Sequence, residues 1–187
     1  MTIKVILENW RKYLTEAKVY TPEEVRAAGF LPSMPDHVFN DMKREGFGEF
    51  LKDRADDIQE QGLEKILATD ATDEIGRDWY NRYNLNWAQD PQILDVSWKD
   101  IDAEVREFLM DKHKGNNPNF PNQQERYADI MQRFPNLGTG DHEPVIVKME
   151  DGKKIVEIIG GKHRTFVAFL KNNFKPIKLN AYVGTAK

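Results

Sequence analysis

The chain has 187 residues, of which 40% are hydrophobic and 31% charged, and its formal net charge is −4. This length and composition suit a globular domain of ordinary size with an extension. No apolar run approaches the ~20 residues of a membrane helix, so we expect a cytoplasmic protein without a membrane partner. The absence of cysteine excludes disulfides, thiolate nucleophiles and Cys-ligated metals.

Residues 1–16 form an amphipathic segment, with Ile3, Leu7, Trp10 and Leu14 at helical spacing. The segment resembles the capsid-targeting leaders of internal head proteins in large tailed phages, because Leu14-Thr15-Glu16 fits their Leu/Ile-x-Glu cleavage pattern. The resemblance implies cleavage after Glu16 and a location inside the virion. An N-terminal helix that only packs on the domain is the alternative.

A helical extension is expected over residues 17–90. Thr21-Pro22-Glu23-Glu24 predicts a helix start with a capping box, and Gly29 predicts the end of that helix. Further helices are predicted over 36–44, over 49–68, and from a cap at Thr72 or Asp73 to Tyr83.

Four aromatic residues gather near the end of this extension: Trp79, Tyr80, Tyr83 and Trp87. They could form a platform on which bases stack. Their spacing is also that of one helix face, and only Arg77 and Arg82 add positive charge among them. We therefore favour core packing for these rings.

Asp90-Pro91 is the predicted boundary of a second domain, residues 91–187. Its first half predicts a strand over 93–98, a helix over 100–112, a loop over 115–121 and a second helix over 123–134. The first of these helices is expected to have one apolar side, made by Ile101, Val105, Phe108 and Leu109. Its second half predicts three strands, over 145–149, 155–159 and 177–183, and a helix over 165–172. Asp151-Gly152 predicts a hairpin turn between the first two of these three strands.

A candidate anion site lies where the second of these strands meets the helix. Its residues are Gly160, Gly161, Lys162, His163, Arg164 and Thr165. Glycine lets the backbone approach an anion, and the first N–H groups and the dipole of a helix favour negative charge. Residues 142–187 carry nine Lys/Arg against four Asp/Glu, whereas residues 1–141 have a net charge of −9. The alternative is a tight turn with solvated cations.

The strand, Gly-Gly-x-His-Arg and helix, followed by a further strand, resemble the core of the ParB/sulfiredoxin-like superfamily, and Pro144-Val-Ile-Val matches its Pro-Ile-x-Val strand. The resemblance covers residues 93–183 and implies a small mixed α+β sheet with flanking helices. It also implies a loop that holds the phosphates of ATP, ADP or CTP with Mg²⁺. Lys162 stands where sulfiredoxins have their catalytic cysteine, which excludes sulfiredoxin chemistry. The helix-turn-helix domain of chromosome-partitioning members is not expected, since the chain ends at Lys187.

Glu143 and His163 are the candidate catalytic residues. Glu143 precedes the Pro144 strand, where a carboxylate could act as a general base or help to hold Mg²⁺ on the phosphates. Asp141 and His142 are alternates, and each could also be an ordinary solvated residue. The four histidines show no metal-ligand spacing, so no protein metal site is expected.

Three functions follow from these observations. The favoured one is a nucleotide-binding hydrolase or phosphotransferase. A ParB-like DNA nuclease is the second, although the chain offers no clustered carboxylates for a two-metal site. A non-catalytic module that binds DNA or protein, packaged in a phage head, is the third. The sequence does not define the oligomeric state.

Overall fold

The computed structural model describes residues 21–27, 34–70, 74–113 and 123–186. Contacts divide the chain into two compact units, Met1–Tyr83 and Asn84–Lys187. Four predictions lie outside the described residues: the leader with its Glu16 site, the helix end at Gly29, the cap at Thr72 or Asp73, and the 115–121 loop.

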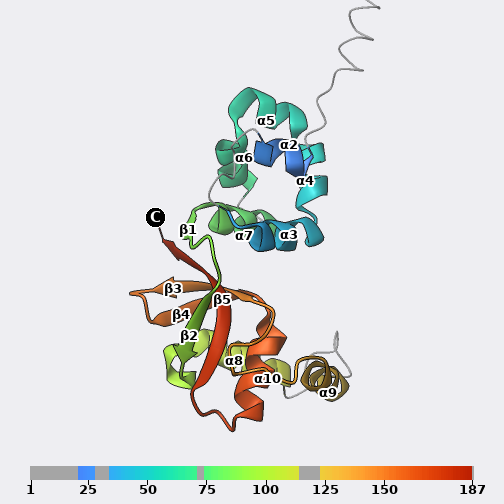
Figure 1. The fold of residues 1–187 in the computed structure, drawn as a ribbon. Helices are drawn as coiled ribbons and strands as arrows, with labels where there is room; N and C mark the ends of the chain where they lie inside the picture. The colour runs from blue at the N-terminus through green and yellow to red at the C-terminus, as the bar shows by residue number, and fades with distance from the viewer. Residues whose placement is uncertain (1–20, 28–33, 71–73, 114–122, 187) are drawn as a thin grey trace, which may run out of the picture. The chain divides into compact units, whose positions relative to one another are not determined.

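The described part of the first unit is helical (Figure 1). Its helices are α2 (Pro22–Ala27), α3 (Asp36–Arg44), α4 (Phe47–Asp53), α5 (Ala55–Gln61), α6 (Leu63–Asp70) and α7 (Glu74–Tyr83). The capping box that starts α2 is confirmed, because Glu24 N–H donates to Thr21 Oγ1 at 3.2 Å and Thr21 N–H donates to Glu24 Oε2 at 2.8 Å. Such a box satisfies two backbone donors that a helix start otherwise leaves without partners.

The single helix predicted over 49–68 is wrong, because the structure divides this stretch among α4, α5 and α6. Arg54, between the first two, leaves the helical region at φ −113° and ψ 12°. Gly62, between the second two, adopts φ 86° and ψ 150°, a conformation that favours glycine. These two breaks let short helices turn back on one another.

Aromatic rings and one buried arginine contribute to the interior of this unit, whose other buried side chains are mostly aliphatic. Trp79 is 5% exposed and lies 5.6 Å from Phe47 and 4.7 Å from Phe50, centroid to centroid. Arg82 is 3% exposed, and its Nη2 donates to Glu45 Oε2 at 2.7 Å. Core packing is thereby confirmed for Trp79, whereas Tyr80 and Tyr83 are only half-buried.

The second unit combines a five-stranded mixed sheet with helices, so the α+β class is confirmed (Figure 1). The strands are β1 (Leu85–Trp87), β2 (Gln92–Val96), β3 (Val145–Glu150), β4 (Lys154–Gly160) and β5 (Ile177–Ala186). The helices are the 3-10 turn η1 (Trp98–Asp100), α8 (Ala103–His113), α9 (Gln123–Arg133) and α10 (Lys162–Lys171).

Strand β5 is the centre of the sheet. β1 and β2 pair antiparallel with successive parts of β5, β3 pairs with it in parallel, and β4 pairs antiparallel with β3. The pairing of β1 makes it part of this sheet, so the second unit starts before Asp90-Pro91, the boundary expected from the sequence. Trp87 lies on this strand and not on a helix face.

Alternate residues of β5 point into the core. Ile177, Leu179, Ala181 and Val183 are buried there with side chains from α8, α9 and α10, while the residues between them are half-buried or exposed. The predicted apolar face of α8 is correct at Leu109, which is 2% exposed, and wrong at Phe108, which is 44% exposed.

The hairpin predicted at Asp151-Gly152 is confirmed, with φ values of 51° and 65° in a turn that joins β3 to β4. The helix predicted from Thr165 begins earlier, at Lys162. Lys162, His163 and Arg164 are therefore the first turn of α10 and not a loop ahead of it.

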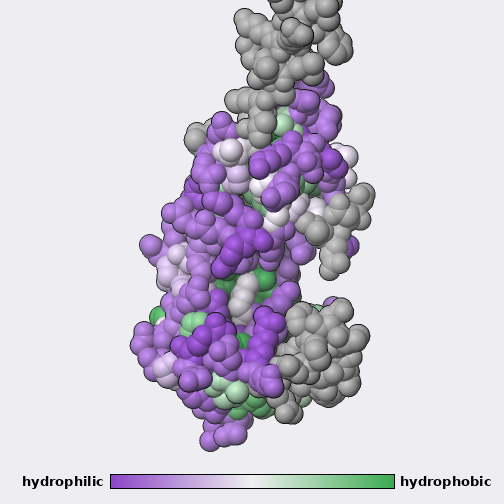
Figure 2. All heavy atoms as spheres, turned by 90° about the vertical axis from the view of Figure 1, so that its right-hand side faces the viewer, coloured by the Kyte–Doolittle hydropathy of each residue, from purple (hydrophilic) through white to green (hydrophobic). Residues whose placement is uncertain are grey.

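Hydrophilic residues cover most of the molecular face shown in Figure 2. Within the described ranges, no helix is long and apolar enough to cross a membrane.

Candidate anion site at the start of α10

The junction between β4 and α10 is a tight turn of two glycines. Gly160 ends β4 opposite Ile146 of β3. Gly161 follows as the N-cap of α10 in the left-handed conformation, with φ 84° and ψ 21°. The predicted passage from strand through double glycine to helix is therefore present.

Gly161 is required by space as well as by conformation. A Cβ atom at this position would lie 2.6 Å from Val145 Cγ1 and 3.0 Å from Val145 Cβ, on the neighbouring strand. Real Cβ atoms do not approach other carbons that closely, and a left-handed φ costs an L-residue about 1–2 kcal/mol. The glycine thus lets α10 start directly against β3.

The start of α10 favours an anion electrostatically. The first backbone bond within the helix runs from Thr165 N–H to Gly161 O at 2.9 Å, so the N–H groups ahead of it point along the axis. The helix, all of whose residues are described, has no side-chain cap and no acidic residue in its first turn. Its dipole and these donors therefore favour negative charge at Gly161.

Lys162 contributes a cation beside an exposed ring. Its Nζ lies 5.5 Å from the centroid of Phe108 on α8. Lys162 is half-buried, and its contact with the ring is a cation–π interaction. The sequence pattern assigned Phe108 to a packed helix face, so this neighbour of the candidate site was missed.

Arg164 is directed toward the chain ahead of β3. Its Nη1 donates to Glu143 Oε2 at 2.7 Å and to Glu143 O at 2.9 Å, and Nη2 donates to Pro144 O at 3.4 Å. Its guanidinium also lies 5.6 Å from the centroid of Phe134. Arg164 therefore fastens α10 to the entry of β3, and its charge is partly balanced by Glu143.

His163 and Thr165 face the interior. The His163 ring lies 6.2 Å from the ring of Tyr127 on α9, whose phenol has its pKa raised by burial. Thr165 is fully buried, and its Oγ1 has no hydrogen-bond partner among the described residues.

The segment before Glu143 is fixed to the central strand by His142. Asn180 N–H donates to His142 Nε2 at 3.3 Å, and Asn180 Nδ2 donates to His142 O at 2.9 Å. A backbone N–H can only donate, so Nε2 accepts and Nδ1 carries the proton, 2.9 Å from Glu143 O. His142 thus positions the segment that leads to Glu143. Asp141 is exposed and accepts from Asn136 Nδ2 at 3.0 Å.

The described residues include no group of three or more His, Asp or Glu side chains that could hold a metal ion. Searches against protein-family models, curated proteins and solved structures find no match to this chain.

The structure brings the predicted residues into one turn but gives them different surroundings. Lys162 and the helix start offer donors and positive charge, Arg164 pairs with Glu143, and His163 with Thr165 packs inward. One oxygen of the Glu143 carboxylate already accepts from the Arg164 guanidinium. The arrangement is therefore suited to binding an anion more than to acid–base chemistry.

Proposed function

We propose that the second unit binds the phosphates of a nucleotide at the start of α10. The observation that carries this proposal is the uncapped, acid-free first turn of α10, brought close to β3 by Gly161. Lys162 supplies a cation on that turn. Arg164 and Glu143 act as positioning residues.

The resemblance to the ParB/sulfiredoxin-like superfamily supports a nucleoside di- or triphosphate as the ligand, because members of that superfamily hold such phosphates with the matching loop. With Mg²⁺ on the phosphates, the favoured activity is hydrolysis or transfer of a phosphoryl group. Within this chain, Lys162 and the helix dipole would stabilise the charge on the phosphate oxygens.

Calorimetric titration of the full chain with ATP, ADP and CTP, each with Mg²⁺, tests the proposal, and assay of released phosphate in the same samples tests hydrolysis. We expect saturable binding that Lys162→Ala weakens by about tenfold, since a charge-assisted hydrogen bond contributes roughly 1.5–3 kcal/mol. Lys153→Ala is the matched control, because Lys153 is an exposed lysine in the β3–β4 turn. Absence of binding below about millimolar concentration, or equal loss in both variants, would contradict the proposal.

A further inference from the structure

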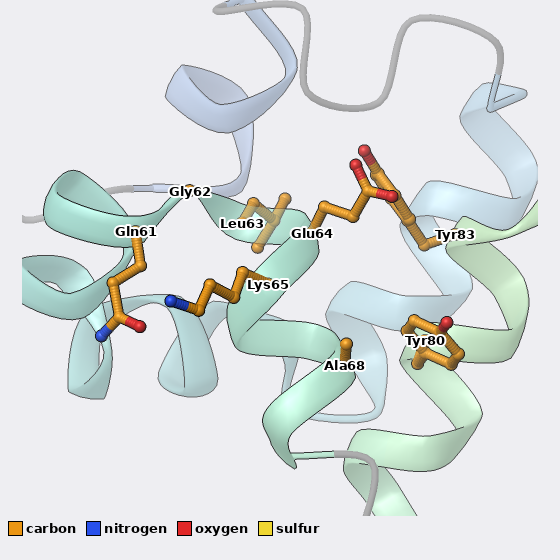
Figure 3. A pocket seen from close by; sticks show the side chains of 8 residues that line it. All are labelled: Gln61, Gly62, Leu63, Glu64, Lys65, Ala68, Tyr80 and Tyr83. Carbon is orange, nitrogen blue, oxygen red and sulfur yellow. The ribbon is translucent and has the colours of Figure 1, made fainter.

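The first unit contains a cavity (Figure 3). It measures about 540 Å³ and lies between α6 and α7, with the end of α5 at one side. That volume is within the range of small-molecule sites. Its polar and aromatic lining comes from Gln61, Glu64, Lys65, Tyr80 and Tyr83.

Helical spacing explains how this lining is assembled. Glu64 and Ala68 are four residues apart on α6, and Tyr80 and Tyr83 are three apart on α7, so each pair shares one helix face. Figure 3 shows Glu64 extending from α6 toward Tyr83 and Ala68 facing Tyr80. The methyl group of Ala68 is small, which leaves room in front of the Tyr80 ring.

The chemistry of this lining favours a cation. A carboxylate beside two phenol rings combines charge attraction with the negative faces of the rings. The pKa of the Tyr83 phenol is raised, first by burial and then by the negative charge of Glu64, which agrees with a carboxylate close to that ring. Among the described residues that line the cavity, Lys65 is the one cation, and it extends from the other side of α6, toward Gln61.

The surrounding charge also selects against anions. Residues 21–83 carry fifteen Asp/Glu and eight Lys/Arg, a net charge of −7. Such a field attracts cations and repels phosphates.

We infer that the cavity between α6 and α7 binds an organic cation, an alkylammonium or guanidinium group, between Glu64 and the rings of Tyr80 and Tyr83. A free polyamine and a basic side chain of a polypeptide both present this chemistry. The site would be separate in residues and in charge preference from the one proposed at α10.

The test is calorimetric titration of the full chain with spermidine and, separately, with end-blocked tri-lysine and tri-arginine peptides. Binding of spermidine alone would identify a small amine as the ligand, and tighter binding of a peptide would identify a polypeptide side chain. Either result, saturating at one ligand per chain, supports the inference. Absence of saturable binding in every titration overturns it.

Three variants separate the cavity from general attraction to an acidic surface. We expect Glu64→Gln and Tyr80→Leu each to weaken binding about fivefold, from loss of the charge and of the ring face. Glu60→Gln removes an exposed carboxylate of α5 outside the cavity and should leave the affinity unchanged. Equal loss of affinity in Glu60→Gln and Glu64→Gln would overturn the inference. The comparison of these two variants decides the matter even if Tyr80→Leu does not fold.

Discussion

At the scale of single residues, Gly161 is a position where the fold should tolerate a larger residue poorly. Gly161→Ala combines left-handed strain with a Cβ atom 2.6 Å from Val145 Cγ1. Strain of about 1–2 kcal/mol and overpacking of about 1–3 kcal/mol predict a loss of about 2–5 kcal/mol in the free energy of unfolding. This loss can be measured by urea unfolding that is monitored through NMR signals of the second unit.

Gly152→Ala is the matched control, because Gly152 has φ 65° and a methyl group at that position would have no described atom within 4 Å. It should show the conformational cost alone, about 1–2 kcal/mol. If the two variants are equally destabilised, Val145 does not restrict position 161.

Arg164 is expected to stabilise the fold more than its ion pair with Glu143 does. Glu143 has a side chain that is 50% exposed, so the pair alone is worth up to about 1 kcal/mol. Arg164→Ala also removes bonds to the carbonyls of Glu143 and Pro144, so we expect it to cost about 2 kcal/mol. A double-mutant cycle with Glu143→Ala measures both quantities, and a coupling energy as large as the full Arg164→Ala loss would contradict this division.

At the scale of elements, the helices and strands that could be predicted are those marked by a local sequence pattern. The strands β3, β4 and β5 follow from apolar runs, and the hairpin between β3 and β4 follows from Asp151-Gly152. The break at Arg54 carries no such signal, and β1 is only three residues long, formed because β5 offers it a partner. These features depend on tertiary contacts, which outweigh local propensity.

Buried Arg82 joins α7 to Asp41 of α3 and to Glu45, which follows α3. Its side chain is 4% exposed and lies 2.7 Å from Glu45 Oε2 and 3.6 Å from Asp41 Oδ2. Arg82→Ala would remove the packing of a buried side chain and its bond to Glu45, while Asp41 keeps its ion pair with Arg44 at 2.8 Å, so we expect a loss of about 2 kcal/mol in the stability of the first unit. Arg77→Ala, at an exposed position of the same helix, should change stability by less than about 0.5 kcal/mol. Similar losses in both would show that Arg82 has no special role.

The η1 turn introduces a dependence on acid. The pKa of Asp100 is lowered from 3.8, first by the Ser97 hydroxyl and then by the Ser97 N–H, which donates at 2.8 Å. A lowered folded-state pKa means that the stabilisation is present above about pH 4 and is lost as the pH falls through the folded value. We expect Asp100→Asn to reduce the decrease in the free energy of unfolding as the pH falls, measured by unfolding between about pH 2 and 6. An unchanged pH dependence in this variant would show that Asp100 does not contribute to it.

At the scale of the whole molecule, the residues of the candidate site could be predicted but not their surroundings. The double glycine and its cations are contiguous in sequence, so the turn was evident. The pairing of Arg164 with Glu143 and of Lys162 with Phe108 depends on β3 lying beside β4 and on α8 lying near α10. Neither arrangement is encoded by spacing along the chain, and the cavity between α6 and α7 arises in the same way.

The division at Asn84 predicts that residues 84–187 fold alone. This segment contains every strand of the described sheet and the core shared with α8, α9 and α10, and it includes β1, whose Trp87 opposes Gly184. A fragment that starts at residue 91 lacks β1 and exposes the β5 edge at residues 184–186, so we expect it to be less stable and to aggregate more readily. Two-dimensional amide NMR spectra of both fragments and of the full chain provide the measurement. Dispersed spectra of equal quality and equal unfolding midpoints for both fragments would show that β1 is dispensable, and collapse of the 84–187 spectrum would show that the sheet depends on residues 1–83.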